Sequence, residues 1–351
     1  MYLKKIKVLI VDDSAIVRDV LSNELAKDSE IEVVGTAPDP YIARDKIVRL
    51  NPDVITLDIE MPRMDGLTFL EKLMTYFPMP VIIVSSITKK DNLAAIKALE
   101  LGAFDVVNKP GESITVEEVK DEILNKIKLA YDNKDIFLEK WKTLNKETQN
   151  KPKKYYLSEL KTTDKLIAIG ASTGGTVALE YIFKSLPRNL PPIVVVQHMP
   201  MGFTYQFARR LNELSELEIK EAEEDEMLEI GHAYIAKGGV HLKLVRKGEF
   251  LYNSFDNSDK VNFQKPAVDV LFESVANVAA RNTLAILLTG MGKDGAAGLL
   301  KIKEAGGYTI AQDEKTSVVW GMPKAAIDIG AAIEILPLDS IISKIVSFVN
   351  N

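Results

Sequence analysis

The first part of the chain alternates short apolar runs with stretches in which apolar residues recur at helical spacing. The apolar runs cover residues 7–11, 31–35, 54–57, 81–84 and 104–107, and a helical pattern follows each of them. Runs that are apolar on both faces, with helices between them, are typical of parallel strands covered on both sides. Residues 1–130 are therefore predicted to form an α/β domain with a doubly wound parallel sheet.

The pattern changes between residues 131 and 164. Lysines are frequent there, Pro152 is the only proline, and the apolar residues lose any regular spacing. Ile136, Leu138 and Trp141 are loosely spaced, which leaves a helix open for the first part. The basic stretch KPKKYY could contact nucleic acid, but a solvated connector is the simpler interpretation. We therefore predict a linker.

A second alternation begins at Leu166. Strands are expected at residues 166–169, 193–196, 233–236, 241–245, 284–288 and 308–311, with helices near residues 177–185, 204–214, 267–280 and 295–305. The segment HAYIAKGGVHL, which starts at His232, is interpreted as a hairpin. Residues 165–351 are thus predicted to form a second α/β domain with a doubly wound parallel sheet.

The composition narrows the class of protein. Apolar residues make up 46% of the 351 positions and charged residues 27%, as in soluble globular proteins. A net charge of −6 disfavours general nucleic-acid binding, and the absence of cysteine excludes disulfides, thiolate metal sites and cysteine nucleophiles. The N-terminal apolar run is too short for a signal peptide or a membrane span. We expect a cytoplasmic protein without membrane insertion.

Polar side chains follow four of the strands predicted in the first domain. Asp12 and Asp13 come after the first strand, Asp58 after the third, Ser85 ends the fourth and Lys109 follows the fifth. The carboxyl ends of parallel strands face one edge of the sheet, where ligands bind. Converging carboxylates repel one another unless a cation lies between them, and oxygen ligands suit Mg²⁺. A hydroxyl group and an ammonium group beside them are what a transferred phosphoryl group requires.

The motifs VLIVDDS, TLDIEMPRMDG, VSS and NKP resemble those of the receiver domains of two-component response regulators, over about residues 4–128. The resemblance implies a flavodoxin-like fold in which Asp58 is the phosphorylation site. It also implies that Ser85 and Lys109 contact the phosphoryl group. The Mg²⁺ ligands that it implies are Asp12, Asp13, Asp58 and the backbone carbonyl of Glu60.

One position departs from the receiver pattern. Many receivers carry Tyr or Phe three residues before the lysine, where this chain has Val106. The departure weakens the hypothesis that an aromatic switch relays the signal here.

The segment Gly170–Gly174, GASTG, follows an apolar strand and precedes a helical pattern. It fits G-x-S-x-G, in which a sharp strand-to-helix turn exposes a nucleophilic serine, here Ser172. A glycine-rich loop that binds phosphate remains an alternative, but no lysine follows the glycines as a nucleotide-binding loop requires. The motif alone is weak support for catalysis.

A serine nucleophile needs a base, and the chain has only three histidines. His198 directly follows the strand PPIVVVQ, at the sheet edge expected for Ser172, whereas His232 and His241 are interpreted as structural. Asp294, in TGMGKDG after another strand, could orient the ring of His198, and it could also cap the next helix. The order Ser, His, Asp differs from that of the α/β-hydrolase family.

Over roughly residues 165–348, the motifs GASTGG, QHMP, GHAYIA, LTGMGKDGAAG and AQDEKTSVVWGMP resemble the catalytic domain of chemotaxis-receptor methylesterases. The resemblance implies a Rossmann-like domain with Ser172, His198 and Asp294 as catalytic triad. It implies backbone amides near Met291 as oxyanion donors, and we add Thr173 as support. The expected reaction is hydrolysis of glutamate γ-methyl esters on chemoreceptor helices, with deamidation of glutamines in many members and no cofactor.

The order of the two predicted domains suggests regulation. Our hypothesis is that the receiver covers the esterase site and that phosphorylation of Asp58 by a chemotaxis histidine kinase favours an open state. We expect a monomer. A catalytically inactive adaptor is the competing class, and the complete triad argues against it. A transcription factor would need a basic helix-turn-helix, which the second half of the sequence does not show.

Overall fold

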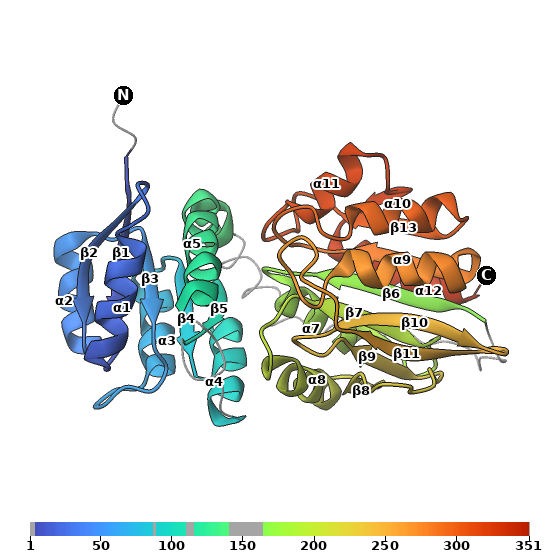
Figure 1. The fold of residues 1–351 in the computed structure, drawn as a ribbon, viewed down its shortest axis with the longest axis horizontal. Helices are drawn as coiled ribbons and strands as arrows, with labels where there is room; N and C mark the ends of the chain where they lie inside the picture. Colours follow the sequence, from blue (N-terminus) through green and yellow to red (C-terminus); the bar gives the residue numbers. More distant parts are fainter. Residues whose placement is uncertain (1–3, 87–88, 110–115, 140–163, 351) are drawn as a thin grey trace. The chain divides into compact units, whose positions relative to one another are not determined.

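The computed structural model describes residues 4–86, 89–109, 116–139 and 164–350. The chain divides into two compact units, residues 1–145 and 146–351, and each is described by itself (Figure 1). No helix among the described residues is long and apolar enough to cross a membrane.

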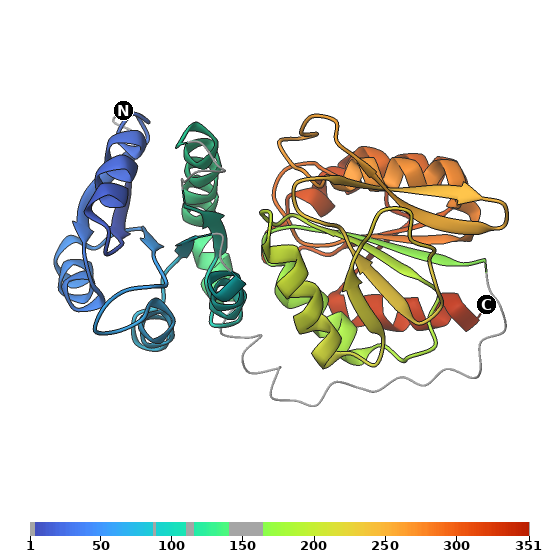
Figure 2. The same cartoon turned by 60° about the horizontal axis from the view of Figure 1, so that its bottom comes forward.

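The first unit has a five-stranded parallel sheet with the strand order β2-β1-β3-β4-β5. Its elements are β1 (Ile6–Val11), α1 (Ala15–Leu25), β2 (Ile31–Ala37), α2 (Pro40–Leu50), β3 (Val54–Leu57), α3 (Gly66–Tyr76), β4 (Val81–Ser85), α4 (Lys89–Glu100), β5 (Asp105–Asn108) and α5 (Val116–Asp132). This is the flavodoxin-like order, as the sequence predicts. The strands β1, β3 and β4 are buried because helices cover both faces: α1 lies beside α5, and α3 beside α4 (Figure 2).

The first unit continues beyond α5. Residues 134–139 are helical, and the buried ring of Phe137 meets the buried ring of Phe104 edge to face, with 5.0 Å between the ring centroids. The Lys134 ammonium also lies 3.3 Å from a carboxylate oxygen of Asp53. The first part of the predicted linker therefore packs on this unit, while residues 140–163 lie outside the described residues.

The second unit has a seven-stranded parallel sheet with the order β14-β13-β12-β6-β7-β9-β8, and a separate antiparallel pair of β10 and β11. Its elements are β6 (Leu166–Ala171), α7 (Gly175–Ser185), β7 (Ile193–Gln197), α8 (Phe203–Leu214), β8 (Glu218–Glu221), β9 (His232–Ile235), β10 (His241–Lys247), β11 (Phe250–Asp256), α9 (Val268–Val278), a 3₁₀ turn (Ala280–Asn282), β12 (Thr283–Leu287), α10 (Ala296–Glu304), β13 (Tyr308–Gln312), α11 (Met322–Asp328), β14 (Glu334–Leu336) and α12 (Leu338–Asn350).

The helices of the second unit lie in two layers. α7, α8 and α12 cover one face of the sheet, whereas α9, α10 and α11 cover the other, with β10 packed against α9 (Figures 1 and 2). β6 pairs with β12 on one side and with β7 on the other, so the strand order reverses beside β6. In doubly wound sheets, ligands bind outside the carboxyl ends of the strands at this switch point.

The hairpin predicted from His232 onward is wrong. β9 lies in the parallel sheet between β7 and β8, and β10 leaves that sheet to pair with β11. The glycines between β9 and β10 serve a close approach instead of a hairpin turn. A Cβ atom on Gly238 would lie only 2.8 Å from the carbonyl oxygen of Pro200.

Candidate functional site

The first unit brings its strand-end polar residues to one edge of the sheet. Asp12 and Asp58 are buried directly after β1 and β3, Ser85 is buried at the end of β4, and Lys109 follows β5. β1, β3, β4 and β5 are neighbours in that order. Asp13, which is exposed, follows Asp12, so five polar residues lie at the carboxyl edge of the same sheet.

Lys109 links the two buried carboxylates. Its ammonium nitrogen lies 2.9 Å from Oδ2 of Asp12 and 2.8 Å from Oδ2 of Asp58. Asp12, Asp13 and Asp58 each offer an oxygen within 4.8 Å of the others, so these three residues form an acidic cluster that could hold a metal ion. An oxygen-only donor set fits a hard divalent cation such as Mg²⁺.

Burial and charge act in opposite directions on Asp58. Burial raises the pKa of its carboxyl group, the pairing with Lys109 lowers it, and the net result is a pKa raised to about 6. Burial by itself would lower the pKa of Lys109, but the two aspartates outweigh burial and hold that pKa above its ordinary value. Lys109 therefore stays charged beside a carboxyl group whose proton is lost close to neutral pH.

The second unit places Ser172 in a sharp turn between β6 and α7. Gly174 has a φ of +79°, a backbone conformation that residues other than glycine rarely adopt. Gly174 is the N-cap of α7, so the helix begins directly after this turn. The Ser172 amide donates to the Thr289 carbonyl (3.0 Å), and the Ser172 carbonyl accepts from the Gln197 side-chain amide (3.0 Å). These bonds fix the backbone of Ser172 between β7 and the loop after β12.

His198 and Asp294 form a close pair. His198 directly follows β7, and its amide donates to the Ala171 carbonyl (3.0 Å), one residue before Ser172. Nε2 of His198 lies 2.7 Å from Oδ2 of Asp294, and both side chains are buried. A carboxylate can only accept, so in the neutral ring the proton is on Nε2 and Nδ1 keeps its lone pair. Nδ1 is buried and has no hydrogen-bond partner among the described residues, Ser172 included.

Asp294 is held by the first turn of α9. The amides of Val268 and Asp269 donate to its two carboxylate oxygens at 2.6 and 3.1 Å, and the side-chain amide of Asn262 donates to Oδ1 at 3.0 Å. Burial raises the pKa of Asp294, but these bonds and His198 outweigh it, so the pKa is lowered. Asp294 therefore remains an anion that can orient and stabilise the His198 ring.

Asp294 does not cap the helix that follows it, which the sequence had left open as a second role. The residue at the N-cap of α10 is Gly295, which makes no side-chain cap, and Asp294 satisfies the amides of α9 instead. Asn262 and the α9 amides could not be found from the sequence, because they lie 25 to 32 residues before Asp294 and no motif links them to it.

The loop after β12 lies directly against Ser172. A Cβ atom on Gly290 would be 2.6 Å from Cβ of Ser172, so only glycine permits this approach. The Thr289 hydroxyl donates to the Thr173 carbonyl (2.9 Å), which ties the two loops together. Met291 follows in the same loop, with its side chain exposed. Thr173 and Met291 therefore lie in two loops that adjoin Ser172, and their part in an oxyanion site stays a prediction.

The other two histidines lie outside this centre. His241 is fully buried: its Nδ1 accepts from the Ala267 amide (3.1 Å) and its Nε2 donates to the Asp259 carbonyl (3.0 Å). His232 lies at the start of β9, where its Nε2 is 3.2 Å from a carboxylate oxygen of Glu218. Neither contacts Ser172 or Asp294 among the described interactions.

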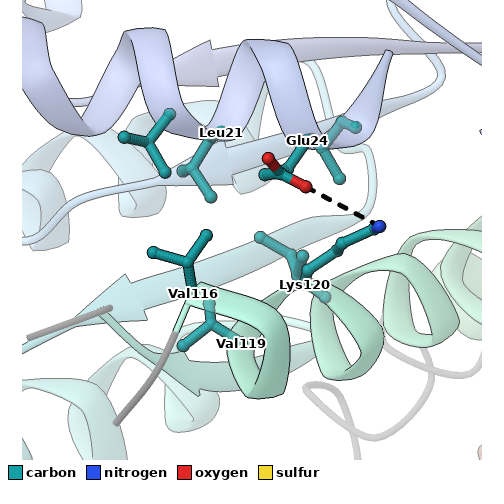
Figure 3. A pocket seen from close by; sticks show the side chains of 8 residues that line it. Leu21, Glu24, Val116, Val119 and Lys120 are labelled. Atoms are coloured by element: carbon teal, nitrogen blue, oxygen red, sulfur yellow. Dashed lines mark ion pairs between the residues drawn. The ribbon is translucent and has the colours of Figure 1, made fainter. Parts of the chain in front are cut away.

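A shallow hollow lies between α1 and α5 of the first unit (Figure 3). Leu21, Val116 and Val119 point into it, and Lys120 reaches across to Glu24, with 3.6 Å between the charged atoms. The lining is otherwise apolar, and its two charged side chains pair with each other. This hollow therefore contributes no chemistry to either centre.

Comparison with known proteins matches both units to known families. Residues 8–120 match the family model of the response regulator receiver domain, and residues 167–345 match that of the CheB methylesterase. The chain is 51% identical to a protein-glutamate methylesterase/protein-glutamine glutaminase of Sulfurimonas denitrificans, over 98% of this chain and 99% of the relative. It is 50% identical to a second such protein, from Syntrophus aciditrophicus, over 99% of this chain and 100% of the relative.

The second unit also resembles a solved structure. The catalytic domain of the CheB methylesterase from Thermotoga maritima is 45% identical, with a TM-score of 0.51. It covers 54% of this chain, and 99% of that domain is matched. The likeness therefore extends over the length of one unit of this chain.

Proposed function

Because the chain belongs to the family of protein-glutamate methylesterases/protein-glutamine glutaminases, with a receiver domain ahead of the CheB methylesterase domain, we propose that Ser172, His198 and Asp294 are its catalytic triad. The observation that carries the proposal is the 2.7 Å contact between His198 Nε2 and Asp294 Oδ2, formed beside the turn that bears Ser172. The proposed substrate is the glutamate γ-methyl ester on chemoreceptor cytoplasmic helices. Glutamine side chains of the same helices are the proposed second substrate.

The proposed reaction starts from the neutral His198 ring that has its proton on Nε2 and a free lone pair on Nδ1. Nδ1 of His198 accepts the proton of the Ser172 hydroxyl as the oxygen attacks the ester carbonyl. The tetrahedral adduct collapses to an acyl-enzyme, and the proton passes from Nδ1 to the departing methoxide, which leaves as methanol. Water then attacks the acyl-enzyme with Nδ1 as base, and the glutamate carboxylate and free Ser172 are regenerated. With glutamine, ammonia leaves in place of methanol.

The negative charge on the substrate oxygen needs donors. We assign this task to backbone amides of the loops that carry Thr173 and Met291, because both loops adjoin Ser172 and are tied together through Thr289. Fixed amides aimed at a developing oxyanion lower the barrier without the cost of reorienting water.

Ser172→Ala tests the esterase assignment. The variant should release methanol from a methylated receptor fragment at least ~10³-fold more slowly than the parent, because the nucleophile is lost. Mass spectrometry of the receptor fragment before and after incubation measures the loss of methyl groups.

The matched control is Ser185→Ala, the same change at a serine whose hydroxyl donates to the Tyr181 carbonyl within α7. Circular dichroism should show both variants folded. Activity of S172A within tenfold of the parent would refute the assignment of the nucleophile.

For the first unit we propose that Asp58 accepts a phosphoryl group from a chemotaxis histidine kinase. Lys109, which lies 2.8 Å from Asp58, and Ser85, at the end of β4, would contact the phosphoryl oxygens. Asp12, Asp13, Asp58 and the Glu60 carbonyl would hold Mg²⁺, which when bound neutralises charge on the phosphoryl group.

We further propose that phosphorylation activates the esterase and so serves adaptation in chemotaxis in the cytoplasm. Support comes from the presence of both units in one chain and in relatives of the same length. The division into a receiver of residues 1–130, a linker of residues 131–164 and a catalytic domain of residues 165–351 stays a prediction, as does the monomeric state.

A further inference from the structure

A tight turn beside the catalytic carboxylate has an unusual residue at its tip. The amides of Val261 and Gln264 donate to each other's carbonyls at 3.1 and 2.9 Å, which closes a two-residue turn. Its central residues, Asn262 and Phe263, have φ values of +50° and +65°. Turns with two positive φ values favour asparagine followed by glycine. Asn262 fits this preference, whereas Phe263 adopts a backbone conformation that is unfavourable for a bulky side chain.

The ring of Phe263 gains no packing that would offset this strain. It is 89% exposed, more than any other large apolar side chain among the described residues. A strained backbone and an apolar ring exposed to water both lower the stability of the folded protein. Residues that combine the two are concentrated at functional sites.

The turn is fixed to the catalytic centre. The side-chain amide of Asn262 donates to Asp294 at 3.0 Å and to Asp269 at 2.8 Å. Asp294 in turn contacts His198. The Lys265 carbonyl, two residues after Phe263, accepts from the Gly239 amide (3.1 Å). Phe263 therefore projects from a turn held rigidly next to the residues that perform the chemistry.

Other exposed apolar side chains come from the same sheet edge. Met201, in the loop after β7, is 57% exposed and lies over Gly239, where a Cβ atom would be 2.7 Å from its terminal methyl group. Met291, in the loop after β12, is 43% exposed. Lys260, directly before the turn that carries Phe263, and Lys293, in the loop that carries Asp294, are exposed. Apolar side chains with nearby cations suit an amphipathic helix that bears acidic residues.

We propose that Phe263 is a specificity-determining residue, whose ring packs against apolar side chains of the receptor helix that carries the methylated glutamate. The inference rests on the proposed function and names the contact by which that site recognises a helix instead of a free ester. The backbone that carries the ring is held in place before the substrate arrives, so binding has to order only the side-chain torsions of Phe263.

Phe263→Gly tests the proposal. Glycine is the preferred residue at this point of the turn, so the variant should melt at no lower temperature than the parent. Two substrates are compared: a methylated cytoplasmic fragment of a chemoreceptor, and the small ester N-acetylglutamate γ-methyl ester. The ratio of kcat/KM for the fragment to kcat/KM for the small ester should fall at least fivefold, mainly through KM for the fragment.

Phe250→Ala is the control, because Phe250 is 56% exposed but begins β11, in the separate antiparallel pair. Its ratio should stay within twofold of the parent. If the ratio of the two kcat/KM values for F263G stayed within twofold of that of the parent, the proposal would be overturned. Faster hydrolysis of both esters by F263G would also overturn it, because the ring would then be a contact that restrains the site. A parent chain that releases no methanol from the receptor fragment would overturn the proposed function together with this inference.

Discussion

Asp58 is buried, and it pairs with an ammonium group 2.8 Å away. With a pKa of about 6, it keeps its proton in the folded protein at pH values where the unfolded chain, with an ordinary value of 3.8, has lost it. Between these values the folded state binds more protons than the unfolded state. The contribution of Asp58 to stability therefore falls as the pH rises from about 4 to 6. The apparent affinity for a cation, which binds the ionised carboxylate, rises over the same pH interval.

The apparent affinity of the full chain for Mg²⁺ should consequently increase by about tenfold between pH 5 and pH 7, because most Asp58 side chains are protonated at the lower pH. Isothermal titration calorimetry at both pH values measures the change. In Asp58→Asn the increase over this interval should be much smaller, since the titrating ligand is gone. Equal affinities of the parent at the two pH values would contradict the prediction.

Single residues could be predicted from the sequence where strand geometry alone determines their place. Asp12, Asp58, Lys109 and His198 each follow a buried apolar run, and parallel strands bring such positions to one edge. Asn262 could not be found in this way, because it acts on Asp294 through the side chain of a distant turn. Which nitrogen of His198 faces Asp294 also depends on tertiary packing and is not encoded in the spacing of the motif.

At the scale of elements, the interior strands of the second sheet were predictable and its edge strands were not. β6, β7 and β12 are buried on both faces and appear as continuous apolar runs. β8 and β14 lie at the two edges of the sheet and are short, and β8 carries charged residues in three of its four positions, so neither has the apolar signal of a strand. β11 was not predicted, because its partner β10 was expected to pair with β9 as a hairpin.

The helical residues 134–139 should contribute to the stability of the first unit. A fragment of residues 1–130 lacks the Phe137 ring that packs on Phe104 and the Lys134 ammonium beside Asp53. Its free energy of unfolding should be lower than that of residues 1–145 by about 3 kcal/mol, the usual cost of losing a buried phenylalanine. Urea unfolding followed by circular dichroism measures the difference.

Two variants within residues 1–145 separate the ring from the rest of the segment. Phe137→Ala should reproduce most of the loss, whereas Ile136→Ala, at the exposed neighbouring position, should change the free energy of unfolding by less than ~1 kcal/mol. Equal stability of the two fragments would show that residues 131–145 act only as a connector.

At the scale of the whole molecule, the proposal is that one unit controls the other. The buried Val106 in β5 provides no aromatic ring at the position where many receivers use one, which weakens the hypothesis of an aromatic relay. A coupling free energy of about 1–3 kcal/mol between phosphorylation and catalysis would correspond to roughly 5–150-fold activation. The full chain, supplied with Mg²⁺ and acetyl phosphate, should therefore demethylate receptor fragments faster by a factor within this range.

Asp58→Asn should show no response to the phosphodonor, and mass spectrometry of the parent should locate the added phosphoryl group on Asp58. The fragment of residues 146–351, which forms a compact unit of its own, should be more active without any donor than the intact, unphosphorylated chain if the receiver restrains the site. A fragment no more active than that chain would exclude restraint and leave direct stimulation as the mechanism. A parent chain that is phosphorylated on Asp58 without any change in rate would exclude regulation by phosphorylation itself, because a ligand shifts an equilibrium only through unequal affinity for its two states.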